Sequence, residues 1–250
     1  MTELLYPAGV VLLGYIVLGI TGFGSALVIV PLLAWHWPLA EVVPLMLLTD
    51  VLASALHGRM NLALIQWVEL RRLLPGMALG AVAGLLLAKQ LDSQWPLLLL
   101  GLYVAFVGAN ALRVSASALR QDGQAAQPTA SAWRWPAGIA IGVVEMLFGT
   151  AGPLVVAWLS RRIADPQALR ANTPVVIGVA SAAVLTVMAG DGQLNHPLLW
   201  QRFIGLVVIA LAGVVAGHHL ARHMPAVRVR QAICGLLVLS GLAMVVRALV

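Results

Sequence analysis

The sequence has few charged residues, one cysteine and a single lysine. Charged side chains make up 10% of its 250 residues and hydrophobic ones 61%, with a mean hydropathy of +0.97. Soluble domains contain about 25% charged and about 45–50% apolar residues, so a soluble fold is excluded and an integral membrane protein is indicated. The lone Cys234 excludes an intrachain disulfide and a thiolate metal cluster. The net charge of +6 suits the basic loops of a membrane protein, and we expect no nucleic-acid partner.

A further absence concerns the energy source. No nucleotide-binding loop of the form G-x-x-x-x-G-K-[ST] occurs in the sequence. We therefore do not expect transport to be driven directly by a built-in ATPase. Coupling to a gradient of protons or sodium ions, or passive flow, remains.

The longest uncharged apolar run, residues 4–35, is interrupted by glycines between residues 19 and 25. One helix of that length would measure about 48 Å, whereas the hydrocarbon core of a bilayer is about 30 Å thick. Two full crossings need about 40 residues, so the run is also too short to span twice. We therefore expect a re-entrant hairpin of two short helices. Lipid tolerates such a break only where protein covers it or the broken backbone lines a cavity.

The second half of the chain repeats the order of the first. Residues 135–159 form another apolar run, broken near residue 150, and three apolar spans follow each broken run. The offset between matching residues grows from 127 to 134 along the chain, which favours a duplication over chance agreement between two Leu- and Val-rich halves. The matching pairs are Gly22 and Gly149, Pro44 and Pro174, Trp67 and Trp200, Gly80 and Gly213, Gly84 and Gly217, and Gly101 and Gly235. The spans are expected at about 41–57, 73–89 and 95–113, and at about 173–190, 202–221 and 231–249.

Basic residues indicate how the broken runs sit in the membrane. If each run crossed once, the arginines would divide almost evenly between the two sides, against the positive-inside rule. If each run enters and leaves on one side, only Lys89, Arg202 and Arg247 of the 15 basic residues fall on the outer side. This arrangement places residues 116–133 in the cytoplasm as a linker and both termini outside.

These observations define the expected fold class, an all-α membrane protein of two inverted-topology repeats. Residues 1–115 form the first repeat and residues 134–250 the second, each with a re-entrant hairpin and three transmembrane helices. Because each repeat crosses an odd number of times, the two lie upside down relative to one another. Secondary transporters commonly have this architecture, with the binding site near the midplane between the repeats.

The glycine breaks are the predicted substrate site. In each hairpin the second helix begins just after the glycines, and the start of a helix favours an oxyanion because its N–H groups are free and its dipole is positive there. Glycine lets a ligand approach the backbone, and the hydroxyls of Ser25 and Thr150 add hydrogen-bond donors. The alternative is that small residues only allow close helix packing. The predicted substrate-binding residues are Gly22, Phe23, Gly24, Ser25, Gly149, Thr150, Ala151, Gly152 and Pro153.

Two carboxylates are expected near the midplane. Asp50 lies about nine residues into its span and Glu145 about ten into its hairpin arm, so each is about 15 Å deep. Such groups are costly in a membrane and indicate proton or ion coupling. Glu145 lies one turn before Gly149, beside the break. The alternatives are a structural role for Glu145 and a pairing of Asp50 with His57 or Arg59.

Other polar residues are weaker predictions. Asn172 and Thr173 precede Pro174, which is typical of a helix N-cap, and His57 could reach the site. His218, His219 and His223 lie beside arginines at a predicted helix end, so we interpret them as a basic terminus and expect no metal or other cofactor.

At these residues the sequence resembles the TauE/SafE family of membrane permeases, which are associated with export of sulfite and organosulfonates. The likeness covers essentially the whole chain, with a Gly-Phe-Gly-Ser first break and a Gly-Thr-Ala-Gly second break where the family commonly has three consecutive glycines. The matching residues are Gly19, Gly22, Phe23, Gly24, Ser25, Ala26, Leu27, Pro31, Leu32, Leu33, Asp50, Leu73, Leu74, Pro75, Gly76, Gly80, Gly84, Gly142, Gly149, Gly152, Pro153, Leu154, Arg170, Ala171 and Asn172. The resemblance implies a small sulfur-containing or carboxylate anion as cargo and the inner membrane of a bacterium as location.

The sequence therefore predicts a secondary anion transporter, an exporter in this family, and not an enzyme. Its partners would be the anion, the lipid bilayer, a coupling proton or sodium ion, and a second copy of the chain in a homodimer. Two other functions remain open at this point. One is an intramembrane serine hydrolase that uses Ser25 with a histidine. The other is a membrane assembly partner that transports nothing.

Overall fold

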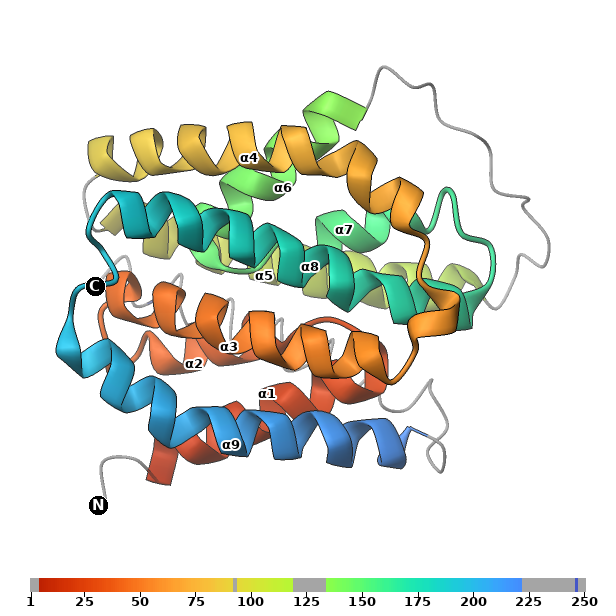
Figure 1. Ribbon diagram of the computed structural model, residues 1–250, viewed down its shortest axis with the longest axis horizontal. Coiled ribbons are helices and arrows are strands. Elements are labelled where there is room, and N and C mark those ends of the chain that lie inside the picture. The colour runs from red at the N-terminus through yellow and green to blue at the C-terminus, as the bar shows by residue number, and fades with distance from the viewer. Residues whose placement is uncertain (1–4, 92–93, 119–133, 222–245, 247–250) are drawn as a thin grey trace.

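The computed structural model describes residues 5–91, 94–118, 134–221 and 246 of the chain. In this part, nine α-helices and one 3₁₀ turn, η2 (Leu62–Leu64), account for the regular structure, and there is no strand (Figure 1). The helices are α1 (Leu5–Thr21), α2 (Ser25–Leu33), α3 (Leu39–Arg59), α4 (Trp67–Gln90), α5 (Gln94–Ala118), α6 (Arg134–Phe148), α7 (Gly152–Leu159), α8 (Pro166–Gly190) and α9 (Pro197–Leu220). The expected span at 231–249 and most of the linker at 116–133 lie outside the described residues.

Four helices, α3, α4, α8 and α9, are long and apolar enough to cross a membrane. Three of them, α4, α8 and α9, begin about six residues earlier than the sequence predicted. Helix α4 starts at Trp67, and α8 starts at Pro166 after Asp165, whose carboxylate accepts from the N–H groups of Gln167 and Ala168. Asp165 is therefore the N-cap, and the prediction that Asn172 caps this helix is wrong. An Asp-Pro pair satisfies both rules for a helix start, an acceptor at the N-cap and proline at the first position.

The first broken segment folds back on itself. Helix α1 ends at Thr21, Gly22 and Gly24 have φ of 85° and 94°, and α2 begins at Ser25. Positive φ is nearly free only for glycine, so these two residues make the turn possible. The Tyr6 hydroxyl donates to the carbonyl of Leu32 over 2.9 Å, which brings the two ends of the segment together.

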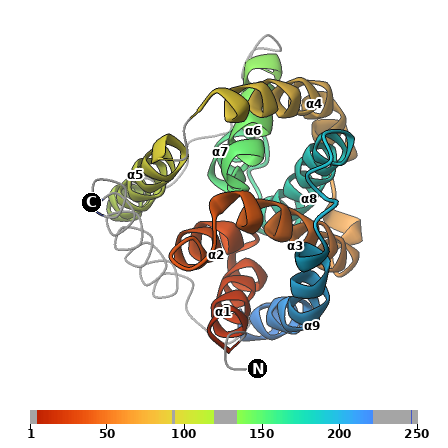
Figure 2. The ribbon, with the colours of Figure 1, turned by 90° about the vertical axis from the view of Figure 1, so that its left-hand side faces the viewer.

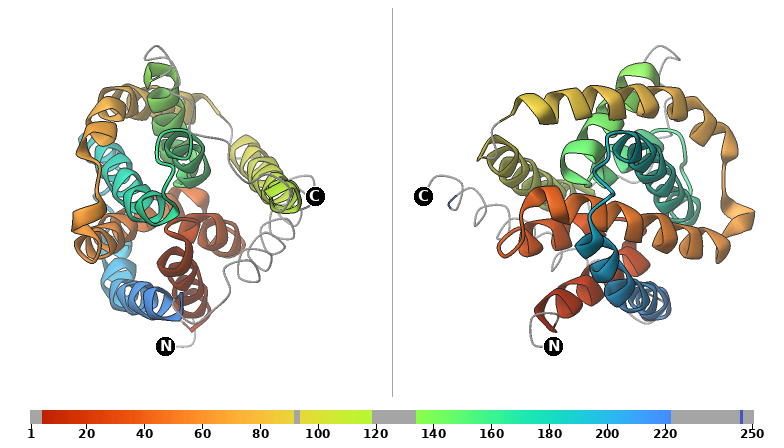
Figure 3. Two further views of the ribbon diagram at one scale, coloured as in Figure 1. Left: turned by 90° about the vertical axis from the view of Figure 1, so that its right-hand side faces the viewer. Right: turned by 60° about the vertical axis from the view of Figure 1, so that its left-hand side comes forward.

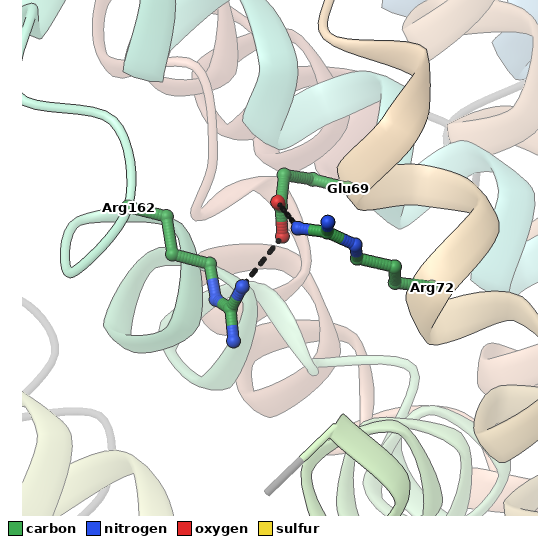
Figure 4. Close-up of polar contacts among 3 residues, drawn as sticks. All are labelled: Glu69, Arg72 and Arg162. Carbon is green, nitrogen blue, oxygen red and sulfur yellow. Dashed lines mark hydrogen bonds and ion pairs between the residues drawn. The ribbon is translucent and has the colours of Figure 1, made fainter. Parts of the chain in front are cut away.

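The second broken segment has the same form. Helix α6 ends at Phe148, Gly149 has a φ of 63°, and α7 begins at Gly152. Arg162, just after α7, binds Glu69 in the first turn of α4 at 3.4 Å and stacks over Trp158 at 4.1 Å. Arg72 also binds Glu69, at 2.5 Å (Figure 4). This cluster ties the end of the second segment to the start of α4.

Glycines join the two halves of the chain. Helix α1 packs along α9, α6 packs along α4, and α3 crosses α8 between these pairs (Figures 1 and 3). Figure 2 shows α5 to the side of the other helices. A Cβ on Gly217 of α9 would lie 2.2 Å from the carbonyl oxygen of Ile16, and one on Gly80 of α4 would lie 2.2 Å from that of Ile139. Both helix pairs therefore depend on backbone contact that any larger residue prevents.

Gly217→Ala should lower the free energy of unfolding by about 2 kcal/mol, because the added methyl group forces α9 away from α1. Gly205→Ala, on the same helix, is the matched control because a Cβ there meets nothing within 4 Å. That control should stay within about 1 kcal/mol of the parent protein. Thermal unfolding in detergent measures both variants, and equal stabilities would contradict the packing described for α1 and α9.

Candidate functional site

The two breaks meet at a small internal cavity, which we call the elbow pocket. Its volume is about 10 Å³. A Cβ on Gly152 would lie 3.5 Å from the side chain of Phe23, so the two breaks are in direct contact. The residues that line the pocket come from both broken segments and from α3 and α8: Gly24, Ser25, Ala26, Leu27, Asp50, Gly149, Thr150, Gly152 and Ile177.

Asp50 joins α3 to both arms of the first broken segment. Its Oδ1 accepts from the Tyr15 hydroxyl at 2.7 Å and from the Ser25 hydroxyl at 3.1 Å. The side chain is only 1% exposed, and its Oδ2 is buried with no hydrogen-bond partner. The alternative pairing with His57 or Arg59 is not present. A buried carboxylate oxygen without a donor is costly, which is typical of functional sites rather than of structural ones.

Glu145 fixes the backbone of the second break and joins it to α8. Its Oε2 accepts from the N–H of Ala151 at 2.8 Å, and its Oε1 accepts from the Ser181 hydroxyl of α8 at 2.6 Å. Each carboxylate oxygen thus has a partner, and the side chain is fully buried. The expected position beside the glycine break is correct. This geometry favours the structural interpretation of Glu145 that the sequence left open.

Thr150 supplies a second polar atom without a partner. Its side chain is 2% exposed, and its Oγ1 is buried and makes no hydrogen bond. Its carbonyl accepts from the Tyr103 hydroxyl at 3.0 Å, and the Tyr103 ring stacks on Phe148 at 6.3 Å. Helix α5 thereby fixes the backbone of the second break while the hydroxyl of Thr150 stays available at the pocket.

The start of α2 also faces the pocket. The first hydrogen bond within this helix runs from the Val28 N–H to the Gly24 carbonyl. The N–H groups of Ser25, Ala26 and Leu27 come before it and have no acceptor in the helix. In the last turn of α1, just before this break, the carbonyl of Gly19 accepts from Arg170 of α8 at 2.6 Å. The pocket thus combines free helix N–H groups, hydroxyls and a carboxylate.

Of the other predicted site residues, Gly22, Phe23, Glu145, Ala151 and Pro153 belong to the broken segments but do not line the pocket, and the three weaker predictions lie elsewhere. Asn172 bonds to the carbonyls of Leu64 and Ala168 and accepts from the N–H of Gln66, so it secures the η2 turn against α8. Thr173 donates to the carbonyl of Leu169 within its own helix. His57 is buried, its ring meets that of His218 at 6.0 Å, and it does not line the pocket.

Sequence reasoning missed four residues that hold the pocket together. Tyr15, Ser181, Tyr103 and Arg170 bind Asp50, Glu145 and the two breaks from distant parts of the chain. A polar residue within an apolar run is a signal that could have found Tyr15 and Ser181. No group of His, Cys, Asp or Glu residues in the described ranges could hold a metal ion.

The sequence profile of the sulfite exporter TauE/SafE family matches residues 7–244, nearly the entire chain. The chain belongs to the TauE/SafE family. Members of this family are membrane transporters, so the chain is a transporter rather than an enzyme.

Two relatives agree with this assignment. The chain is 42% identical over 201 residues to a probable inner membrane transporter protein, TsaS, of Comamonas testosteroni, covering 80% of this chain and 81% of that one. It is 27% identical over 201 residues to a probable sulfite/organosulfonate exporter, TauE, of Cupriavidus necator, covering 80% and 73%. No solved structure matches the chain significantly. The predicted membership of the TauE/SafE family is confirmed.

The hydrogen bond between Ser181 and Glu145 gives a test of the site. Ser181→Ala leaves a buried carboxylate oxygen without its donor and should lower the free energy of unfolding by about 2 kcal/mol. Thr186→Ala is the control on the same helix, because its exposed hydroxyl bonds only to the carbonyl of Ala183. It should change stability by less than about 0.5 kcal/mol. Thermal unfolding in detergent would contradict the structural role of Glu145 if Ser181→Ala matched the control.

Proposed function

We propose that this transporter carries small anions across the inner membrane of a bacterium and binds them in the elbow pocket. Sulfite, organosulfonates and related sulfur-containing or carboxylate anions are the proposed cargo. One observation carries the proposal, the meeting of both breaks at a cavity where Asp50 and Thr150 each have a buried oxygen without a partner. The α2 N–H groups and the Ser25 and Thr150 hydroxyls would bind the oxyanion. The name of the relative from Cupriavidus necator, a probable sulfite/organosulfonate exporter, supports this class of cargo.

We further propose that the chain consists of two inverted repeats, residues 1–115 and 134–250, joined by a cytoplasmic linker at 116–133. The pairing of helices supports this, because each broken segment packs against a long helix of the other half, α1 on α9 and α6 on α4. Equivalent glycines make both contacts, since Gly80 and Gly213 are partners in the repeat, as are Gly84 and Gly217. In this arrangement the termini lie outside, and Lys89 and Arg202 lie on the outer face.

The size of the pocket implies motion during transport. A volume of about 10 Å³ is about enough for one water molecule, and an anion of four or more heavy atoms needs several times as much. The two breaks must therefore separate to admit cargo. Alternate opening toward the two membrane faces, by rocking of one repeat against the other, would provide that space.

Asp50 is the proposed proton carrier. An ionised carboxylate about 4 Å from an anion would repel it by about 4 kcal/mol at an effective dielectric constant of 20. Protonation of Asp50 removes this repulsion and weakens the hydrogen bond that the Ser25 hydroxyl donates to Asp50 Oδ1, because a neutral acceptor binds less strongly than a charged one. Ser25 could then donate to the cargo instead. Binding of the anion and of the proton would thus be coupled at one side chain, and both would move in the same direction.

The geometry gives no support to a serine hydrolase. The Ser25 hydroxyl donates to Asp50 and not to a histidine, and no histidine lines the elbow pocket. The serine hydrolase considered from the sequence needs a histidine within hydrogen-bond reach of Ser25 that can accept its proton and pass it to a leaving group.

Transport by purified protein in liposomes tests the proposed cargo class and the proposed proton role of Asp50. Sulfite and a short alkanesulfonate should leave liposomes that contain the protein faster than they leave protein-free liposomes. The charge of the alkanesulfonate does not change with pH, which makes it the better probe of proton coupling. An acidic lumen should accelerate alkanesulfonate efflux by the parent protein. Asp50→Asn should still transport but lose this acceleration, because its amide cannot take up a proton. A sodium gradient of equal size should have no effect on the parent.

Asp165→Asn is the matched control, because asparagine caps a helix as well as aspartate does and Asp165 does not line the pocket. This variant should retain the response to pH. Acceleration that persists in Asp50→Asn would remove the proton role of Asp50, and an absence of flux for every anion tested would remove the proposed cargo class.

A further inference from the structure

A second, larger cavity lies at the end of the molecule that carries Lys89 and Arg202. It has a volume of about 660 Å³ and lies between the first turns of α3 and α9 and the last turns of α4, α6 and α8. We call it the vestibule. Its lining includes Glu41, Lys89, His196 and Arg202 together with Met146 and Met188. The polar groups come from helix ends and the methionines from positions nearer the interior.

Two ion pairs frame the vestibule and join helices from opposite halves of the chain. Lys89 at the end of α4 binds Asp191, which caps α8. Arg202 of α9 binds Glu41 of α3 at 2.5 Å and lies over the Trp37 ring at 3.9 Å. The hydrogen bond from Lys89 also lowers the pKa of Asp191, which favours the ionised carboxylate. Charged groups of this kind favour water inside the cavity.

The inner wall of the vestibule is a thin apolar layer. Val43 and Leu47 of α3, Met146 of α6 and Met188 of α8 form one cluster, each no more than 3% exposed. Val43, Met146 and Met188 line the vestibule directly. On the other side of the layer, a Cβ on Gly149 would lie 3.7 Å from Val43 and 3.9 Å from Leu47. Gly149 lines the elbow pocket, so one layer of side chains separates the two cavities.

We propose that the vestibule is the water-filled outer mouth of the transport path and that Val43, Leu47, Met146 and Met188 form its gate. This inference rests on the proposed function of the elbow pocket. An anion that leaves the pocket crosses only this layer to reach the vestibule. Unbranched methionine side chains can turn aside without moving a helix, which suits a layer that must open and reseal.

Cysteine labelling in oriented membrane vesicles tests the path. In a Cys234→Ser background, Met146→Cys should react with a membrane-impermeant maleimide added on the Lys89 side. Helix α6 and its hairpin enter from the opposite side, so the reagent can reach this position only through the vestibule. Ala140→Cys is the control on the same helix, exposed on its surface but away from the vestibule, and it should not react. Solubilisation in detergent should make Ala140→Cys reactive.

The gate is tested by Ser25→Cys, which lies behind the layer in the elbow pocket. It should react slowly from the Lys89 side, and adding Val43→Ala should speed the reaction about tenfold, because loss of two methyl groups lowers the cost of opening the layer. Leu70→Ala/Ser25→Cys is the control, because it removes a buried side chain outside the layer and should leave the rate unchanged.

Each outcome has a definite meaning. No reaction of Met146→Cys in vesicles, together with reaction in detergent, would overturn the vestibule as a water-filled mouth. Equal rates for Ser25→Cys with and without Val43→Ala would overturn the gate. Labelling does not depend on cargo, so the expected pattern in a protein that transports none of the anions tested would uphold the vestibule while the cargo proposal failed.

Discussion

Broken helices inside a hydrophobic protein leave backbone groups that must find partners, and this requirement shapes the structure. At the first break the Thr21 hydroxyl lies within hydrogen-bond distance of the Val17 and Phe23 carbonyls, and Arg170 donates to the carbonyl of Gly19. At the second break Glu145 accepts from Ala151 and Tyr103 donates to Thr150. The partners come from α5, α6 and α8, so the elbow pocket exists only when most of the fold is in place.

Glycine contacts then determine which elements can move together. The α1–α9 and α4–α6 pairs touch through their backbones, and each pair combines a broken segment with a long helix from the other half. At these contacts the neighbouring backbones already touch, so the two helices of each pair fit together closely. A change of conformation would move each pair as one body. The crossing of α3 and α8, where Asp50 lies, is then the natural place for relative motion.

The sequence was most informative where the pattern is local. Run length and glycine position predicted both breaks. It failed where structure depends on contacts between distant segments. Tyr15 binds Asp50 across 35 residues and Ser181 binds Glu145 across 36, and no spacing rule connects such pairs. The early start of α8 is a different kind of error, because the Asp165-Pro166 pair signals a helix start in the sequence itself, and Pro174 lies within the helix.

The two breaks share a backbone form but are held in different ways. Glu145 lies on α6, the helix that leads into the second break, and both of its carboxylate oxygens accept hydrogen bonds. Asp50 reaches the first break from the neighbouring helix α3, and its Oδ2 has no hydrogen-bond partner. The second break is therefore held by its own helix, whereas the first depends on a neighbouring one. A displacement of α3 would break the contacts of Asp50 with the first break and leave the contact between Glu145 and Ala151 in place.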